Sequence, residues 1–225
     1  MFKKLLFVFQ IIISIPKTIY FNVRVFNLSI AVKMPVFVWY NVKLLEIYKN
    51  SVIIDTKKIK PFMIKIGIGG SNAIKNSKSL LFLSKNNKGE IYFKEKAKFS
   101  NGITLYVNGG KIEFGNDFSC NKNCFISSDN KIIFGDDVLI GWNVTIRDSD
   151  GHKILYKNKI ERENKVIFGN HVWICSCVDV LKNTNIGDDC VIGYKSLVTN
   201  LEVENNKLVA GMPAKIIKEN INWEK

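Results

Sequence analysis

The residues best suited to acid–base chemistry lie together in the segment Asp148-Ser149-Asp150-Gly151-His152. His152 follows Asp150 by two residues and Asp148 by four. A carboxylate that orients an imidazole and stabilises its charged form creates a general base for deprotonating a hydroxyl or an amine. We therefore predict that His152 is catalytic and that Asp148 or Asp150 assists it. The alternative is an exposed turn made of ordinary turn-forming residues.

Metal chemistry is not expected from this sequence. The chain has two histidines, and the second, His171, lies inside a regular repeat where a structural role is expected. A three-histidine zinc site therefore cannot form. The five cysteines include no C-x-x-C pair and are odd in number, which argues against a zinc site and a disulfide framework. We expect buried thiols in a reducing compartment. These residues are Cys120, Cys124, Cys175, Cys177 and Cys190.

The element that must position these groups is a repeat of six residues, which fits neither a strand nor an α-helix. One position of the repeat is apolar in every copy: Phe168, Ile174, Val180, Ile186, Ile192 and Val198. The position four residues later is small or β-branched: Val172, Val178, Thr184, Cys190 and Ser196. A strict period of six predicts a parallel β-helix whose apolar residues point inward. Glycine follows the apolar residue at positions 169, 187 and 193, where we expect it to permit unusual backbone angles.

Weaker copies of the repeat extend towards the N-terminus, with apolar or small residues at Phe93, Phe99, Leu105, Phe114, Cys120, Ile126, Phe134, Ile140 and Ile146. If the repeat runs unbroken, about eight or nine coils are expected. The repeat stops at 147–166, a mostly polar stretch predicted to leave the prism as a functional loop. We divide the chain into an apolar and basic segment (1–50), the β-helix domain (51–205) and a tail (206–225), expected to be a short helix or irregular cap.

The N-terminal segment combines apolar, aromatic and basic residues. Lys3 and Lys4 precede an apolar run from Leu5 to Ile13, but Pro16 follows in place of a cleavage site. The run is predicted to be too short to span a bilayer as a helix. Its composition favours peripheral contact with an anionic membrane, and the alternative is a cap on the first coil.

The formal net charge of +13 calls for an anionic partner or surface. Anionic lipid and a polyphosphate cofactor are candidates, and a solvated basic surface is the alternative. No aromatic and basic stacking motif is present, so nucleic-acid binding is not expected.

Several motifs together resemble those of a known family. They are Phe168–Ile174 (FGNHVWI), Ile186–Asp189 (IGDD), Gly211–Ile217 (GMPAKII) and the Asp-x-Asp-Gly-His loop. The sequence resembles the hexapeptide-repeat acyltransferases with a left-handed β-helix, most closely those that acetylate capsular polysaccharide or lipopolysaccharide sugars. The resemblance implies a left-handed coil, acetyl-CoA as donor, and a homotrimer with active sites between neighbouring prisms. It also implies that His152 is the catalytic histidine.

By position, the resemblance implies that Ser176, Thr199, Lys215 and Lys218 contact CoA, with the two lysines meeting its phosphates. Trp173 is a candidate for stacking on cofactor or sugar, or for wall packing. Three places depart from the family pattern: Cys175, Tyr194-Lys195 and Asn200 stand where Gly, Ala-Gly and a basic residue are usual.

The sequence therefore predicts a cytoplasmic O-acetyltransferase, peripheral at the inner face of the plasma membrane. His152 takes a proton from a sugar hydroxyl of a cell-surface polysaccharide or lipid-linked glycan, and the oxygen attacks the acetyl thioester without a covalent enzyme intermediate. Two alternatives stay open: N-acetylation of an amino sugar nucleotide, and a non-catalytic β-helix scaffold.

Overall fold

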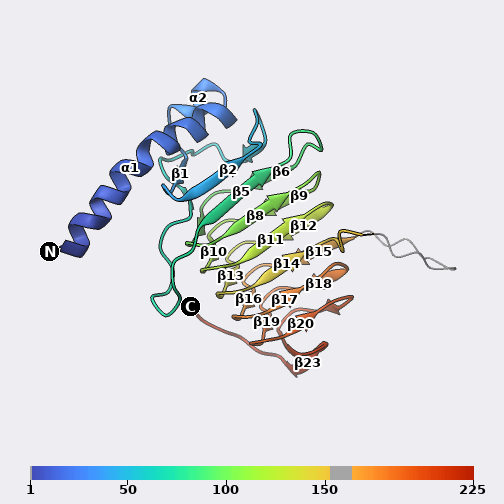
Figure 1. Cartoon of the computed structure of the whole chain (residues 1–225). Helices are drawn as coiled ribbons and strands as arrows, with labels where there is room; N and C mark the ends of the chain where they lie inside the picture. Colours follow the sequence, from blue (N-terminus) through green and yellow to red (C-terminus); the bar gives the residue numbers. More distant parts are fainter. Residues whose placement is uncertain (1, 153–163) are drawn as a thin grey trace.

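The computed structural model describes residues 2–152 and 164–225. Its strands wind into a three-sided prism, and a long helix lies across the N-terminal end (Figure 1). The helices are α1 (Phe2–Val25) and α2 (Leu28–Ala31). We refer to the three walls of the prism as sheets A, B and C.

Each wall is one sheet whose neighbouring strands differ by three in chain order, so each coil contributes one strand to each wall. Sheet A contains β1 (Val36–Val38), β4 (Ile64–Ile66), β7 (Ala97–Phe99), β10 (Phe118–Cys120), β13 (Leu139–Ile140), β16 (Trp173–Ile174), β19 (Val191–Ile192), β22 (Lys207–Gly211) and β23 (Ala214–Glu219). Sheet B contains β2 (Val42–Leu45), β5 (Ser79–Leu83), β8 (Thr104–Val107), β11 (Phe125–Ser128), β14 (Thr145–Arg147), β17 (Asp179–Val180) and β20 (Leu197–Val198). Sheet C contains β3 (Val52–Ile54), β6 (Glu90–Phe93), β9 (Lys111–Phe114), β12 (Lys131–Phe134), β15 (Lys165–Phe168), β18 (Thr184–Ile186) and β21 (Glu202–Val203).

The predicted left-handed parallel β-helix is confirmed. All neighbouring strands pair in parallel except β22 and β23, which form an antiparallel pair. The walls extend beyond the predicted limits of 51 and 205, because Val36–Val38 and Val42–Leu45 already pair with the second coil. The predicted loop 147–166 is also shorter at both ends, since Arg147 closes β14 and Lys165 opens β15.

The predicted inward positions form the core. Every apolar and small residue of the repeat between 168 and 198 is at most 1% exposed. At the ends of four successive strands of sheet C, phenylalanine rings stack on one another at centroid distances of 5.1, 5.2 and 5.1 Å: Phe93, Phe114, Phe134 and Phe168. One side chain per coil therefore fills the prism in a continuous column, which keeps successive coils in register.

The glycines of the repeat have a different role from the predicted one. Gly169 and Gly187 do not have positive φ angles. Instead, a Cβ at Gly169 would lie 2.3 Å from the Asp188 carboxylate, and one at Gly187 would lie 2.4 Å from the Asn205 side chain. The prediction of unusual angles there is wrong, because the close approach of the next coil leaves no room for a side chain. The positive angles fall two residues later, at His171 and Asp189.

Helix α1 covers the open edge of β1 through a row of polar side chains at i, i+4 spacing. The Ser14 Oγ accepts a hydrogen bond from the Tyr40 amide (3.0 Å), the Thr18 Oγ1 from the Val38 amide (3.0 Å), and the Asn22 Oδ1 from the Val36 amide (3.2 Å). These three side chains are fully buried. An exposed strand edge invites pairing with other chains, and α1 prevents it here.

The buried side of α1 is mixed, because Phe21 and Val25 are fully buried beside this polar row. The helix also exposes large apolar residues to solvent: Leu5, Leu6, Phe7, Val8, Phe9, Ile12, Ile13, Ile19, Tyr20 and Val23. The stretch Lys4–Val25 is long and apolar enough to cross a bilayer, judged by length and composition alone. The prediction of a segment too short to span was therefore wrong, because the helix continues through Pro16.

The C-terminal end is closed by the hairpin β22–β23 rather than by the predicted short helix or irregular cap. The chain then turns back along the prism, and Trp223 packs its ring on His171 at 4.1 Å between centroids. The indole Nε1 donates to the His171 carbonyl at 2.8 Å. These contacts bury Trp223 and fix the tail.

Candidate functional site

His152 follows β14 of sheet B and precedes β15 of sheet C, so it lies at the corner between these two sheets. Its side chain is exposed. Within residues 2–152 and 164–225, no hydrogen bond or ion pair holds its imidazole. The rest of the predicted loop, residues 153–163, lies outside the described residues. Among the described residues, none occupies the imidazole, which is therefore accessible to a substrate.

Asp148 does not face this imidazole. Its carboxylate is fully buried and accepts hydrogen bonds from the Ser128 hydroxyl (2.6 Å), the Asp129 amide (2.8 Å) and the Asn130 amide (3.0 Å). Burial raises the pKa of Asp148, and the three donors oppose that rise. Asp148 thus ties the start of the loop to the preceding coil, and the prediction that it can orient His152 is not supported by this geometry.

The second predicted carboxylate, Asp150, is paired with Lys182 at 2.5 Å. Lys182 comes from the next coil, at the same corner of the prism. The Arg147 guanidinium lies beside Gly151, and its Nε is buried without a hydrogen-bond partner among the described residues. Two cationic side chains therefore lie beside the segment that carries His152, and one of them is neutralised by Asp150.

The environment of His171 is the opposite. Its Nδ1 lies 2.9 Å from the Asp189 carboxylate, and its Nε2 lies 3.8 Å from that of Asp137. Trp223 covers one face of the ring. Lys225 is ion-paired with Asp137. A histidine whose ring lies between two carboxylates and under a tryptophan fits a structural role, as expected from the sequence.

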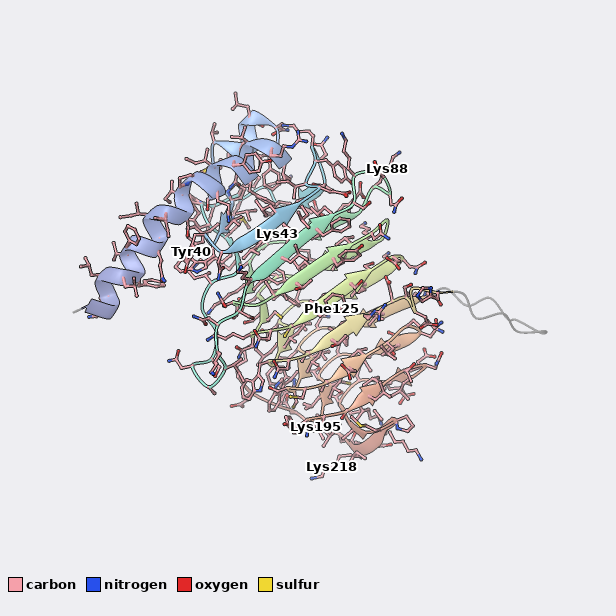
Figure 2. The ribbon with its side chains drawn as sticks, in the orientation of Figure 1. Tyr40, Lys43, Lys88, Phe125, Lys195 and Lys218 are labelled. Atoms are coloured by element: carbon pink, nitrogen blue, oxygen red, sulfur yellow. The ribbon has the colours of Figure 1, made fainter. Side chains whose placement is uncertain are left out.

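The predicted cofactor-binding residues fall into two groups. Thr199 follows β20 and lies at the same sheet B–C corner as His152, two coils further along. Trp173, Lys215 and Lys218 are exposed on sheet A, and Lys218 projects from the end of the prism opposite α1 (Figure 2).

Ser176 occupies the corner between sheets A and B, and its Oγ accepts a hydrogen bond from the Trp142 amide at 3.2 Å. Its side chain is largely buried, which leaves it tied to the neighbouring coil rather than open to a ligand. One prism therefore holds His152 and Thr199 on one corner and the two lysines on another wall.

Two contacting residues were not found from the sequence: Ser128 and Lys182. Ser128 and Lys182 are separated from their partners by 20 and 32 residues, and they meet them only because coils stack. No local motif marks them. Among the described residues, no group of three His, Cys, Asp or Glu side chains is arranged to hold a metal ion.

Comparison with known proteins gives several relatives. The chain is 31% identical over 157 residues to WbbJ of Escherichia coli K12, whose assignment as a lipopolysaccharide biosynthesis O-acetyl transferase is itself provisional. That match covers 62% of this chain and 79% of WbbJ. It is 38% identical over 114 residues to the galactoside O-acetyltransferase of the same strain, covering 49% of this chain. The chain thus spans about half (55%) of the length of that enzyme.

Among solved structures, the polySia-specific acetyltransferase NeuO superposes with a TM-score of 0.55. It is 23% identical, and the superposition covers 84% of this chain and 74% of that one. This likeness supports the fold. No family model matches the chain.

Proposed function

Because the chain belongs to the hexapeptide-repeat acetyltransferases, the family of WbbJ, we propose that it transfers an acetyl group from acetyl-CoA to a hydroxyl of a cell-surface glycan. The observation that carries this proposal is the state of His152. It is exposed in the break of the repeat between β14 and β15, and no described group occupies its ring nitrogens.

In the proposed reaction, one imidazole nitrogen of His152 accepts the proton of the sugar hydroxyl as its oxygen attacks the thioester carbonyl. The tetrahedral intermediate collapses, and the CoA thiolate leaves and takes up a proton. A neutral imidazole near pH 7 is suited to this step. The buried thiols take no part.

Transfer to oxygen is favoured over N-acetylation of a sugar nucleotide, because the matched relatives carry O-acetyltransferase names. The same matches oppose the scaffold alternative. The direct test incubates the protein with acetyl-CoA and candidate glycans, and follows the acetyl mass shift on the glycan together with CoA release. CoA release without glycan acetylation in every acceptor would contradict the proposal.

A trimer is the second part of the proposal. His152 and Thr199 lie at one corner of the prism, whereas Trp173, Lys215 and Lys218 belong to sheet A. A site that uses both groups therefore needs a second copy, whose sheet A faces the first copy's loop. The test is complementation. Mixed assemblies of His152→Ala with Lys215→Ala/Lys218→Ala should regain activity that neither variant has alone. An additive mixture would argue for sites within one chain.

Peripheral membrane contact is the third part. Helix α1 exposes ten large apolar residues, and the exposed cations Lys4, Arg24 and Lys33 lie in or just after it in the sequence. Apolar insertion together with attraction to anionic lipid is the usual basis of interfacial binding. Because Ser14, Thr18 and Asn22 bind β1, the helix is expected to lie on the surface without leaving the prism.

This contact is tested by flotation with anionic vesicles. The variant Ile12→Ser/Ile19→Ser/Val23→Ser changes only the exposed face and keeps the row of polar contacts. It should float much less than the wild type while its melting temperature changes little. Equal flotation would contradict membrane contact through α1. Removal of the first 50 residues is unsuitable here, because it also deletes β1 and β2.

A further inference from the structure

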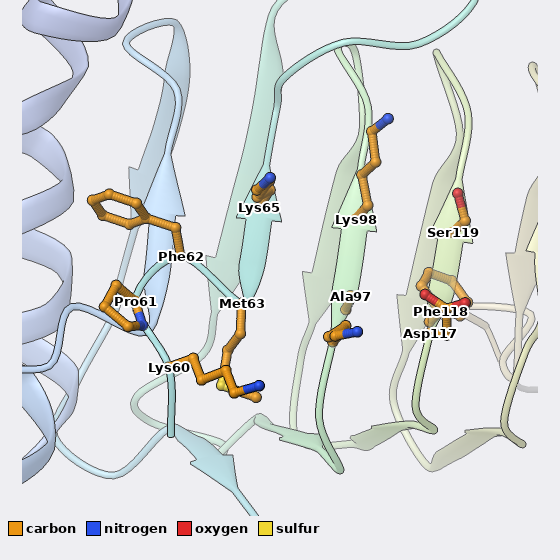
Figure 3. Close-up of a pocket in the computed structure, with 11 residues that line it drawn as sticks. Lys60, Pro61, Phe62, Met63, Lys65, Ala97, Lys98, Asp117, Phe118 and Ser119 are labelled. Carbon is orange, nitrogen blue, oxygen red and sulfur yellow. The ribbon is translucent and has the colours of Figure 1, made fainter. Parts of the chain in front are cut away.

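A basic groove on sheet A lies away from the corner that carries His152. It has a volume of about 360 Å³ and is lined by β4, β7, β10 and the turn before β4 (Figure 3). Phe62 and Met63 contribute its apolar surface, whereas the Phe118 ring is buried in the core of the prism. Four lysines lie around it: Lys60, Lys65, Lys96 and Lys98. All four are exposed, and among the described residues none of them forms an ion pair.

The two lysines at the centre of the groove are expected to destabilise the sheet that carries them. Lys65 and Lys98 are direct cross-strand partners on the outer face of β4 and β7. Like charges placed directly opposite one another destabilise a sheet. The next outward position on this row is Ser119, which offers no compensating charge.

A second lysine pair in the same molecule shows how the fold compensates such a contact. Lys111 and Lys131 are cross-strand partners in sheet C. There, the Glu113 carboxylate lies 3.0 Å from one ammonium and 3.4 Å from the other. In the groove, the carboxylate present is Asp117, which lies 3.8 Å from Lys225. The sheet A lysines thus keep their charge uncompensated, and departures of this kind are expected at functional sites.

The position of the groove suggests what occupies it. In sheet A its strands lie between β1, the strand that α1 covers, and β13, whose coil carries the His152 loop. Ring contacts link Phe62 to α1 through Phe37, Trp39 and Phe7. An acceptor chain running from the N-terminal end of the prism towards the catalytic coils would therefore pass over the lysines.

We propose that this groove binds an anionic segment of the glycan acceptor, through carboxylates or phosphodiesters along the sugar chain. The apolar side chains of Phe62 and Met63 fit the less polar faces of sugar rings, and the four ammonium groups bind the charges. The inference rests on the proposed function for the role of the glycan. It adds that the acceptor is an acidic polymer, held by coils that take no part in the chemistry.

Calorimetric binding without acetyl-CoA tests this inference, because it does not depend on turnover. The probe is polysialic acid, compared with a neutral dextran of similar length. Replacing two cations in the variant Lys65→Ala/Lys98→Ala should raise Kd for the acidic polymer roughly tenfold. It should also flatten the salt dependence of binding. The matched control, Lys57→Ala/Lys58→Ala, removes the same charge from exposed positions outside the groove and should bind like the wild type.

The alternatives are distinguishable outcomes. Unchanged binding of the acidic polymer by the groove variant, or equal loss in the control variant, overturns the inference. Weaker binding of acetyl-CoA or of anionic vesicles by the groove variant, with glycan binding intact, assigns the groove to cofactor or lipid and also overturns it. Where acetylation is measurable, the groove variant should raise KM for the acidic acceptor and leave kcat unchanged. Glycan binding without any acetylation would contradict the proposed function alone.

Discussion

The two histidines of this chain lie in neighbouring coils, and each has two carboxylates nearby in its surroundings. At His171 the carboxylates of Asp137 and Asp189 lie against the ring, and Trp223 covers it. At His152 both carboxylates have other partners: Asp148 binds a turn and Asp150 binds a lysine. The carboxylates beside His152 thus stabilise the loop base, and no residue in 2–152 or 164–225 binds the imidazole. The two histidines therefore differ in whether the neighbouring carboxylates bind the imidazole or bind other groups, and not in the number of carboxylates.

The largest effect that would test this contrast is on turnover. We expect His152→Ala to lower turnover by about 10²- to 10⁴-fold, the usual contribution of a general base. Its melting temperature should match the wild type, since no described contact is lost. His152→Asn should behave in the same way with less change in volume. Near-normal turnover with a verified acceptor would contradict the catalytic assignment.

The next effect concerns Asp148, which we expect to act on stability. In Asp148→Asn the side-chain NH₂ group must face at least one of the three groups that donate hydrogen bonds to the carboxylate in the wild type. An unmet buried hydrogen bond costs about 1–3 kcal/mol. Chemical denaturation should show this loss in the free energy of unfolding. A variant as stable as the wild type would show that the turn does not depend on Asp148.

The same residue predicts a pH dependence. Burial raises the pKa of Asp148 above its ordinary value of 3.8, so the folded state holds the proton more tightly than the unfolded state. Its contribution to stability is therefore full below the unfolded pKa and is lost as the pH rises through the folded pKa. Denaturation curves from pH 3.8 upwards should show this decline in the wild type. The decline should be weaker in Asp148→Asn.

A smaller effect is expected at His171. His171→Ala and Trp223→Ala each remove the ring stack that fixes the C-terminal tail. Aromatic pairs of this kind contribute about 0.5–1.5 kcal/mol, so a double-mutant cycle should give a coupling of that size. Turnover by His171→Ala should stay near the wild-type value. A large loss of turnover without a loss of stability would remove the contrast between the two histidines.

The smallest effect is expected for Asp150. Its pair with Lys182 is partly exposed, and such pairs are worth up to about 1 kcal/mol. Asp150→Asn should therefore change the melting temperature little and reduce turnover by less than His152→Ala. A fall in turnover as large as that of His152→Ala would show that Asp150 moves to the imidazole during the reaction.

The fold was predictable because its signal is local and repeated. Residues such as Ile174 and Val180 recur every six positions, and the structure buries each of them completely. The reason for Gly169 could not be read in this way, because the atom that excludes its Cβ belongs to Asp188 in the next coil. A sequence pattern shows which residues repeat, whereas the physical reason for a residue such as Gly169 lies in contacts between coils.

The candidate site was predictable only in part for the same reason. Closeness in sequence suggested that Asp148 assists His152, but the stronger partner of Asp148 is Ser128, 20 residues earlier. The N-terminal helix gave a similar error: Pro16 and the interspersed polar residues suggested a short run. Ser14, Thr18 and Asn22 are spaced by four, and this spacing could have indicated one buried polar face of a longer helix.

The stacking of coils also sets a length. In sheet B, β2, β5, β8, β11 and β14 are consecutive, so four strand spacings separate the first coil from the coil that carries His152. At 4.7–4.9 Å per spacing this is about 19 Å. Side-chain substitutions cannot alter that span, whereas insertion or deletion of one whole coil would change it by a single step. The number of coils thus sets the distance between the His152 loop and the helix at the N-terminal end of the prism.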